Sequence, residues 1–336
     1  MKLSIILPFQ KNKKRSVLKA LINEDFQSSN FEIVVIVDNN IFPKNFKHLN
    51  FLKEKYQDRV KVIFNSRNQG INKNIVEGIK YASGEYFFVL TQNNHIKKSF
   101  ISQLLYLINK FDSDIIEFRM KTRGLIDFEP KQRIKTKSKV SIEEKPEILA
   151  FSFPLLFNKI FKKSIFDEID KNKVLKLYNT KFSVELLYFA FFYAKTYVYV
   201  NTEIIEEHID KNDLFSPTMF YKEWKNILDF YQKNESPFLS ELFYSYFYFF
   251  LVYSTGILAN LKEGKIRNLI NVMENKSINN SVALKKLTKV IDNILEKDKS
   301  NFKSTNKYMM LKNQETQMML NPLKESDWEK ILHLLE

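Results

Sequence analysis

The sequence contains no cysteine and only four histidines among its 336 residues. A chain without cysteine has no disulfide, no thiolate metal site and no cysteine nucleophile. Four scattered histidines also argue against a zinc centre. Glycine and proline are scarce, with six and eight residues respectively. Six glycines leave little room for a phosphate-binding loop or a dinucleotide fingerprint, and neither pattern occurs.

Positive charge is in clear excess, with 53 Lys and Arg residues against 39 Asp and Glu, and a formal net charge of +14. Such a balance favours polyanionic partners, although solvated surface lysines are the simpler interpretation of any single cluster. No recognisable nucleic-acid-binding module accompanies the charge. We therefore expect an anionic membrane surface, and no nucleic acid, as a partner.

The composition is that of a globular protein, because hydrophobic residues make up 44% of the chain and charged residues 27%. Its first third alternates between strand-like and helix-like segments. The strand-like segments are 3–9, 31–40, 60–66 and 86–90, and the helix-like segments are 13–26 and 72–82. The apolar run at 3–9 is too short for a signal peptide. This alternation predicts an α/β fold with a mainly parallel sheet flanked by helices.

Polar residues follow the predicted strands at the point where each strand ends. They lie at Pro8–Gln10, Asp38–Asn40, Asn65–Asn68 and Thr91–Asn94. In sheets of this kind, ligands bind beyond the carboxyl ends of the strands. We therefore expect these four clusters to meet at one edge and to form a binding site.

The remainder of the chain divides into an apolar middle part and a helical C-terminal part. Residues 121–146 are polar, basic and without periodicity, which predicts a long loop that acts as a lid or a binding loop. We expect three parts: residues 1–120, residues 121–215 with this loop, and a helical region at residues 216–336.

Residues 243–261 form a stretch of 19 residues without a charge, the length of a minimal membrane span. Its tyrosines and serines are poorly suited to the middle of a bilayer. A buried core helix, or a helix lying on a bilayer, fits better than a span. Residues 281–297 are amphipathic, and we expect that helix either to pack on the body or to contact a membrane.

The order of these segments resembles the family-2 glycosyltransferases, which have the GT-A fold. The matching stretches are "SIILPF", "EIVVIVDNN" and "NQGINKNIVEGIKYASGEYFFVL", followed by "FNKIFKKSIFDEI" and "FFYAKTYVYVN". The resemblance extends over roughly residues 1–210. The segment "FNKIFKKSIFDEI" is similar to the acceptor-side segment of family members that make capsular polysaccharides and glycolipids. It implies a GT-A half at 1–120 that binds a nucleotide sugar, and an acceptor-side part at 121–215.

The resemblance assigns nucleotide-sugar contacts to several residues of the predicted edge. Asp38 falls on the acid that reads the base, and Pro8 and Phe9 match the loop that lines the nucleotide. Asn68 matches the first residue of an Asn-x-Gly turn. A carboxylate can accept a hydrogen bond from a uracil N–H. The simpler interpretation of Asp38 and Asn68 is turn chemistry at the end of a strand.

Three acidic or cationic motifs of the family are altered here. The family's metal-binding acids align with Thr91 and Asn93, which Asn94 follows, and amide oxygens bring no charge to a cation. Mg²⁺ or Mn²⁺ is the cofactor that the resemblance implies, with Asn93 as the candidate ligand. The family's Arg-Asn pair aligns with Ile75 and Val76.

The downstream acidic pair, which supplies the general base, aligns with Phe182 and Ser183. Glu185 is the nearest carboxylate, two residues further on and about 200° around a helix. Ser183 and Glu185 are the candidate catalytic residues. Sugar transfer requires a base that deprotonates the acceptor hydroxyl while this hydroxyl attacks the donor sugar.

Two hypotheses account for the altered motifs. In the first, protein cations replace the metal's charge in a metal-independent transferase, and Lys73 and His208 are the candidates. A solvated lysine and a loop histidine are the simpler interpretations of these two residues. In the second, the fold persists without catalysis as a nucleotide- or lipid-binding scaffold for an active paralogue.

We expect the first hypothesis to describe the protein. The function is then transfer of a sugar from a nucleotide sugar, with a UDP-sugar foremost, to a lipid or glycan acceptor. The net charge of +14 and the aromatic stretch favour a lipid-linked acceptor and peripheral attachment at the cytoplasmic face of the cell membrane.

Overall fold

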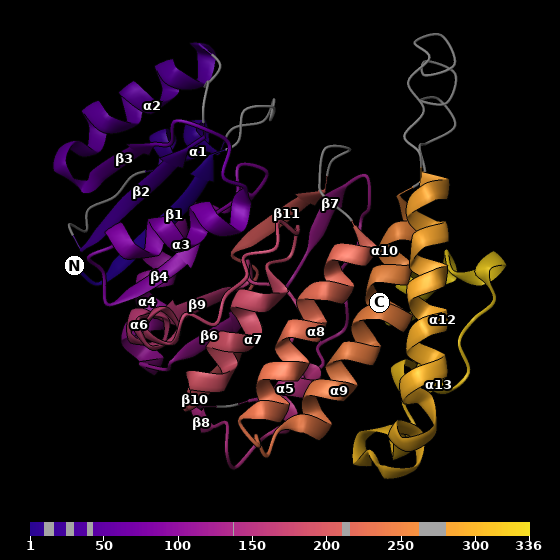
Figure 1. Cartoon of the computed structure of the whole chain (residues 1–336). Coiled ribbons are helices and arrows are strands. Elements are labelled where there is room, and N and C mark those ends of the chain that lie inside the picture. The colour runs from indigo at the N-terminus through magenta and orange to yellow at the C-terminus, as the bar shows by residue number, and fades with distance from the viewer. Residues whose placement is uncertain (10–16, 25–29, 39–42, 137, 210–215, 262–279) are drawn as a thin grey trace, which may run out of the picture.

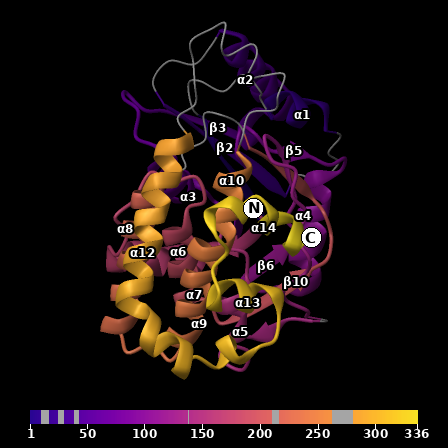
Figure 2. The same cartoon turned by 90° about the vertical axis from the view of Figure 1, so that its right-hand side faces the viewer.

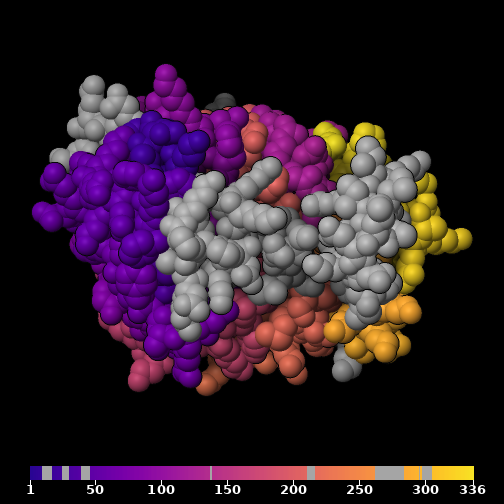
Figure 3. All heavy atoms as spheres, turned by 90° about the horizontal axis from the view of Figure 1, so that it is seen from above, coloured from indigo at the N-terminus to yellow at the C-terminus, as the bar shows by residue number. Residues whose placement is uncertain are grey.

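The structure is a computed structural model that describes the chain except for residues 10–16, 25–29, 39–42, 137, 210–215 and 262–279. A large twisted sheet lies toward the N-terminal side, and a group of long helices packs beside it (Figure 1). Seen from above, the N-terminal residues gather at one end of the molecule and the C-terminal residues at the other (Figure 3).

The main sheet has eight strands in the order β3-β2-β1-β4-β9-β6-β10-β8. The strands are β1 (Leu3–Phe9), β2 (Phe31–Val37), β3 (Val60–Phe64), β4 (Tyr86–Val89), β6 (Ile115–Phe118), β8 (Val140–Ser141), β9 (Lys159–Lys162) and β10 (Thr196–Val200). Strand β1 pairs in parallel with β2 and β4, and β2 pairs in parallel with β3. Strand β9 is antiparallel to both β4 and β6. The prediction of a mainly parallel sheet is confirmed.

A smaller sheet of three strands lies beside the main one, in the order β5-β11-β7. Its strands are β5 (His95–Ile96), β11 (Ile205–Ile209) and β7 (Thr122–Gly124). Strand β11 is parallel to β7 and antiparallel to β5. It therefore brings residues just after β4 next to residues from much later in the chain.

Both faces of the main sheet are covered, as the continuous apolar strands require. Leu3, Ile5 and Leu7 of β1 point into one hydrophobic core and Ile6 into the other. The first core contains residues of α1 (Leu18–Asn23), α2 (Pro43–Tyr56) and α4 (Phe100–Phe111). The second contains residues of α3 (Ile71–Tyr81), α5 (Glu147–Phe151), α6 (Lys163–Asn172) and α7 (Val184–Tyr193).

The second core continues without a break into the C-terminal helices. These are α8 (Pro217–Lys233), α9 (Leu239–Tyr248), α10 (Thr255–Asn260), α12 (Asn280–Thr305), α13 (Gln314–Leu320) and α14 (Lys330–Leu335), with a π-helical turn at Phe249–Ser254. Helix α12 contacts α8 and α10 and forms the outer layer of this group (Figures 1 and 2). Shorter 3₁₀ turns lie at Gln57–Arg59, Lys307–Met310 and Glu325–Asp327.

The uncharged stretch at 243–261 is a core helix. Within the described residues, the helix Leu239–Asn260 is long and apolar enough to cross a membrane, and 94% of its apolar window is buried inside the protein. Helix α12 also packs on the body, with Leu287, Ile291 and Ile294 buried. Its lysines at 285, 286 and 289 are exposed. The packing interpretation is therefore confirmed for both segments.

The prediction of one long loop at 121–146 is wrong in part. The segment contributes β7 to the small sheet and β8 to the edge of the main sheet. Ile126, Phe128 and Ile134 anchor it in the second core. Its apolar residues have neither helical nor strand spacing, because each one anchors an irregular backbone at a separate point.

Candidate functional site

The carboxyl ends of β1, β2 and β4 lie side by side, because β1 pairs in parallel with both neighbours. Pro8 lies opposite Ile36 of β2, and Ile6 lies opposite Val89 of β4. Pro8 and Phe9 end β1 in buried positions. Strand β3 joins them, because it pairs in parallel with β2. The residues that follow β2, β3 and β4 therefore emerge at one edge of the sheet, here called the polar edge: Asp38, Asn65 and Thr91–Asn94. Gln10, Asn39 and Asn40 lie outside the described residues.

Asp38 is a buried carboxylate that organises the turn after β3. It accepts hydrogen bonds from Asn65 Nδ2 at 3.0 Å, from the Gln69 amide at 3.2 Å and from the Gly70 amide at 3.3 Å. Asn68 is exposed, and its Oδ1 accepts a second bond from the Gly70 amide at 3.0 Å. A carboxylate has about four acceptor positions. Asp38 can therefore hold this turn and still accept a bond from a ligand.

Gly70 is the N-cap of α3 and has φ +87°, in the left-handed region that favours glycine. A Cβ at this position would lie 3.0 Å from Asn179 Cγ. The Oδ1 of Asn179 accepts a hydrogen bond from the Ile71 amide at 3.0 Å and so caps α3. The close approach of Asn179 and the turn conformation both require glycine here.

Asn74 extends the network of Asp38 toward α3. Its Oδ1 accepts a hydrogen bond of 2.9 Å from Asn65 Nδ2, which also serves Asp38. Asn74 is fully buried, and within the described residues its Nδ2 has no hydrogen-bond partner. A buried amide donor of this kind is normally satisfied by a protein group, water or ligand. Lys73 is half-buried in the same first turn of α3, whereas Ile75 belongs to the core.

Thr91 to Asn94 form a compact buried turn at the end of β4. Asn94 Oδ1 accepts a hydrogen bond of 2.6 Å from the Thr91 amide, and the Asn94 amide donates to Thr91 O at 3.1 Å. Asn94 Nδ2 and Thr91 Oγ1 both donate to Glu207 Oε2, the latter at 3.4 Å. Asn93 is buried within the turn. These amide and hydroxyl groups therefore face a carboxylate supplied by β11.

Glu207 forms a buried ion pair with Lys181. Glu207 Oε1 lies 2.5 Å from Lys181 Nζ, and each residue is 5% exposed. The backbone amide of Glu207 donates to Lys121 O at 2.8 Å, within the small sheet. The Lys181 ammonium therefore lies next to the turn Thr91–Asn94, and this turn contains the positions where the resemblance expects metal-binding acids.

The sequence analysis missed both members of this pair. Lys181 is one of many lysines, and Glu207 follows an identical residue, Glu206. Successive strand residues point to opposite faces, so only the pairing of β11 shows which glutamate reaches the polar edge. Glu207 is also 116 residues away from Thr91 in the chain, so no local sequence pattern indicates that the two side chains are in contact.

The segment Tyr178–Ser183 joins this ion pair to α3. Asn72 Nδ2 donates to Tyr178 O, and Ser183 Oγ donates to Asn72 Oδ1 at 2.5 Å. Ser183 is fully buried and has φ 53° at the N-cap of α7. The structure therefore brings Ser183 to the N-terminus of α3, where its hydroxyl donates to the side-chain amide oxygen of Asn72, the residue before Lys73.

Glu185 points its carboxylate elsewhere. It is fully buried and accepts hydrogen bonds from the Lys176 amide at 3.0 Å, the Leu177 amide at 2.9 Å and Asn226 Nδ2 at 2.6 Å. Burial raises the pKa of this carboxyl. These contacts join the loop that precedes α7 to helix α8. The geometry therefore does not support the catalytic role that the sequence suggested.

A second buried acid, Glu223 of α8, lies at the N-terminus of α7. It accepts hydrogen bonds of 2.8 Å from Thr180 Oγ1 and from the Glu185 amide. Complete burial raises the pKa of Glu223 to about 8. The resemblance places an acidic pair at Phe182 and Ser183, and here the acid at this helix end comes from the C-terminal region instead.

His208 lies on the opposite face of β11 from Glu207, because neighbouring strand residues alternate. Its ring lies against Gly124, where a Cβ would be 2.7 Å from His208 Cε1 and where φ is +108°. The structure therefore directs the side chain of His208 away from the face that contacts Thr91 and Asn94.

The side chains of the Thr91–Asn94 turn, together with Glu207, do not fit a divalent cation. Thr91 and Asn93 offer neutral oxygen atoms, and the nearby carboxylate of Glu207 is already paired with Lys181. Within the described residues, no group of three His, Cys, Asp or Glu side chains could hold a metal ion. Hard cations prefer several carboxylate or carbonyl oxygens, and this set supplies no free negative charge.

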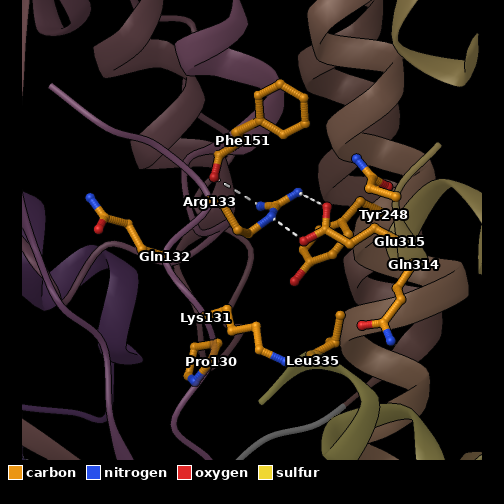
Figure 4. Close-up of a pocket in the computed structure, with 10 residues that line it drawn as sticks. Pro130, Lys131, Gln132, Arg133, Phe151, Tyr248, Gln314, Glu315 and Leu335 are labelled. Atoms are coloured by element: carbon orange, nitrogen blue, oxygen red, sulfur yellow. Dashed lines mark hydrogen bonds and ion pairs between the residues drawn. The ribbon is translucent and has the colours of Figure 1, made fainter. Parts of the chain in front are cut away.

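A separate hollow of about 280 Å³ lies where residues 130–133, α5, α9 and the segment 313–315 meet (Figure 4). The Arg133 guanidinium binds Glu315, with Nε 2.7 Å from Oε1, and donates to Phe151 O at 3.0 Å. It also lies 3.6 Å from the ring centroid of Tyr248. These contacts fasten residues 130–133 to the C-terminal helices, so we assign the Arg133 cluster a structural role.

Known proteins share both sequence and fold with this chain. Residues 4–170 match the family model described as Glycosyl transferase family 2. A dolichol-phosphate mannosyltransferase of Pyrococcus furiosus is 32% identical over 116 residues, which are 34% of this chain and 32% of that protein. The chain thus matches about a third of the length of this curated relative.

Crystal structures of S. aureus TarS share the fold. TarS 1–349 in complex with UDP has a TM-score of 0.54 and 20% identity, over 68% of this chain and 65% of that one. TarS 1–349 in complex with UDP-GlcNAc has a TM-score of 0.55 and 16% identity, over 95% and 78%. With its GT-A architecture and its match over residues 4–170, this chain belongs to glycosyl transferase family 2.

Proposed function

We propose that this protein is a glycosyltransferase that moves a hexose from a UDP-sugar to a hydroxyl of a lipid or glycan acceptor. The observation that carries the proposal is the Asp38 network at the polar edge, within the part of the chain that matches the family model. The mannosyltransferase relative and the TarS complexes with UDP and UDP-GlcNAc support a sugar donor of this class.

Asp38 is the group that reads the base in this proposal. Its carboxylate is held in place by three donors from the turn, so its orientation is set before a ligand arrives. A rigid acceptor of this kind suits the ring N–H of uracil. Pro8 and Phe9 end the neighbouring strand in buried positions and form apolar support behind this edge. Asn74 Nδ2 adds a buried donor to the same edge.

In the proposed reaction, the acceptor hydroxyl oxygen bonds to the anomeric carbon of the sugar. The bond from that carbon to the diphosphate oxygen breaks, and UDP leaves with the bonding electron pair. The hydroxyl proton passes to a base or to water. Stabilisation of the charge that develops on the diphosphate is the largest requirement of this step.

Titration calorimetry with UDP tests the donor site. We expect the wild type to bind UDP, and Asp38→Asn to bind it at least about tenfold more weakly, because the amide replaces one acceptor position by a donor. Asp170→Asn, at an exposed site that pairs with Lys80, is the matched control and should bind as the wild type does. The absence of UDP binding by the wild type would overturn the proposal.

Transfer itself is tested with radiolabelled UDP-hexoses and a membrane lipid extract. Label that moves into the organic phase supports a lipid acceptor, and label that moves into soluble oligosaccharide supports a glycan acceptor. UDP binding without transfer to either acceptor would instead indicate the non-catalytic scaffold.

We also propose that the protein works at the cytoplasmic membrane face through electrostatic contact. Lys285, Lys286 and Lys289 are exposed on α12, whose apolar face is buried in the body. Attachment would therefore depend on charge, and each lysine near an anionic surface contributes about 1 kcal/mol. We expect flotation with anionic vesicles at low salt, and release at high salt. Binding that survives high salt would contradict this mode of attachment.

A further inference from the structure

We propose that the ammonium of Lys181 takes the place of a divalent cation at the donor diphosphate, so that the donor binds without metal. This inference rests on the proposed function and specifies the chemistry of the same site. It concerns the polar edge at Thr91–Asn94, where the family resemblance expects acids that bind a metal.

The position of Lys181 carries the inference. Its Nζ pairs with Glu207 Oε1, while Glu207 Oε2 accepts hydrogen bonds from Thr91 Oγ1 and Asn94 Nδ2. A single carboxylate thus links the ammonium directly to the turn that follows β4. The cation therefore lies within one side chain of the positions that would otherwise hold a metal.

The charges at this turn add up as they would in a metal site. Two acids with a divalent cation have no net charge, and one acid with one ammonium has none either. Thr91 and Asn93 are uncharged where the family resemblance expects two acids. The pair of Glu207 and Lys181 is also neutral overall, and it contains a cation. A diphosphate that approaches this turn therefore meets a positive group that is balanced by a single carboxylate.

Lys181 is held in place from two sides. Its neighbours in the chain are fixed, because Asn179 caps α3 and Ser183 binds Asn72. Its carboxylate partner is fixed by the small sheet, in which the Glu207 amide donates to Lys121 O. An ammonium positioned in this way needs little reorganisation when charge develops on a leaving group.

The chemistry of an ammonium suits this role. It has three N–H donors, so it can serve a carboxylate and a phosphate oxygen at the same time. Lys181 and Glu207 are each only 5% exposed. In such a site the attraction between unit charges is several times stronger than in water. Lysine acts as a point charge toward phosphate, as a metal ion does.

The test measures UDP affinity by calorimetry in excess EDTA and again with Mn²⁺. We expect the wild type to bind UDP with the same affinity in both conditions, within about twofold. The critical variant is Lys181→Met with Glu207→Gln, which removes both charges and keeps a hydrogen-bonding side chain beside Thr91 and Asn94. The single variant Lys181→Met leaves a buried carboxylate unpaired and is less suitable, because it risks unfolding.

The double variant should lose about 10- to 100-fold in UDP affinity in EDTA, the range expected for a charge-assisted hydrogen bond. Its affinity for uridine, which has no phosphate, should remain that of the wild type. A purely structural role would weaken both ligands equally. Lys176→Met, in the exposed part of the same loop, is the matched control and should bind both as the wild type does.

Three results overturn the inference. They are a double variant that binds UDP as tightly as the wild type, an equal loss for uridine and UDP, and a wild type that binds UDP only with Mn²⁺. The last result would leave the proposed donor site intact. UDP binding in neither condition would overturn the proposed function itself, so the two failures are distinguishable without any variant.

Discussion

Glu223 of α8 accepts a hydrogen bond of 2.8 Å from the hydroxyl of Thr180, in the segment that precedes α7. A fully buried carboxyl from the C-terminal region thus holds the loop that also contains Lys181 and Ser183. Because burial raises its pKa to about 8, this contact makes the stability of the loop sensitive to pH. The connection between α8 and the polar edge leads to the first prediction.

Glu223→Gln should remove a pH dependence of stability. In the folded protein the pKa of the Glu223 carboxyl is about 8, well above the ordinary glutamate value of 4.5. The contribution of the protonated carboxyl is therefore fully present below 4.5 and is lost as the pH rises through 8. Urea unfolding should show that the wild type loses about 3 kcal/mol from this group between pH 5 and 7.5.

The variant should lack this loss and be more stable than the wild type above pH 8. Glu54→Gln, at an exposed position, is the control and should follow the wild type at every pH. A pH profile of Glu223→Gln that coincides with that of the wild type would contradict the prediction.

Glu185→Gln should affect stability more than catalysis. Glu185 accepts two backbone amides and the Asn226 side chain, and a glutamine would present a donor where one acceptor is needed. We expect a loss of about 1–3 kcal/mol in unfolding free energy and a change of only a few-fold in kcat. A loss of kcat beyond a hundredfold at unchanged stability would restore Glu185 as the general base.

Gly70→Ala should weaken both the fold and UDP binding. The alanine backbone would have to adopt φ +87°, and its Cβ would lie 3.0 Å from Asn179 Cγ. Strain of this kind costs about 1–3 kcal/mol. Because the Gly70 amide is a donor to Asp38, movement of the turn should also raise the Kd for UDP. Gly84 is no control, since its Cβ would clash with the β1 backbone, and Ser66→Ala, an exposed residue of the same turn, serves instead.

Lys159→Met should be strongly destabilising. Lys159 is fully buried, with Nζ 3.3 Å from Glu117 Oε2 and 2.8 Å from Phe153 O. Removal of the cation leaves the Glu117 carboxylate buried without its ion-pair partner, which costs about 3–5 kcal/mol. Combination with Glu117→Gln should recover most of the loss in thermal denaturation. A single variant as stable as the wild type would show that this pair contributes nothing.

Much of the fold could be predicted from the sequence, because the first third has strong local signals. The β-branched run of β2 and the apolar run of β4 are typical of buried parallel strands, and the structure contains both. The antiparallel β9 was missed, since "KIFK" lacks a signal that separates it from the apolar residues around it. Its place between β4 and β6 results from pairing between distant strands.

The site was predictable only where polar residues end a strand. Asp38 follows β2 directly and Thr91 lies two residues after β4, so the topology of the sheet puts them at one edge. Lys181 comes from the segment before α7, Glu207 from β11 and Glu223 from α8, and the fold brings these elements together only in three dimensions. In a sequence so rich in lysine, no local pattern distinguishes Lys181 from its solvated counterparts.

The second hydrophobic core runs from Ile6 of β1 through Trp224 of α8 to Leu332 of α14. The sheet and the C-terminal helices therefore form one cooperative unit, because neither can separate without exposing a large apolar face to water. A fragment that stops before α8 would keep every residue of the family match and yet expose the apolar faces of α5 and α7, which α9 and α8 cover. The half that matches the family and the helical half of this protein thus depend on each other to keep their apolar faces covered.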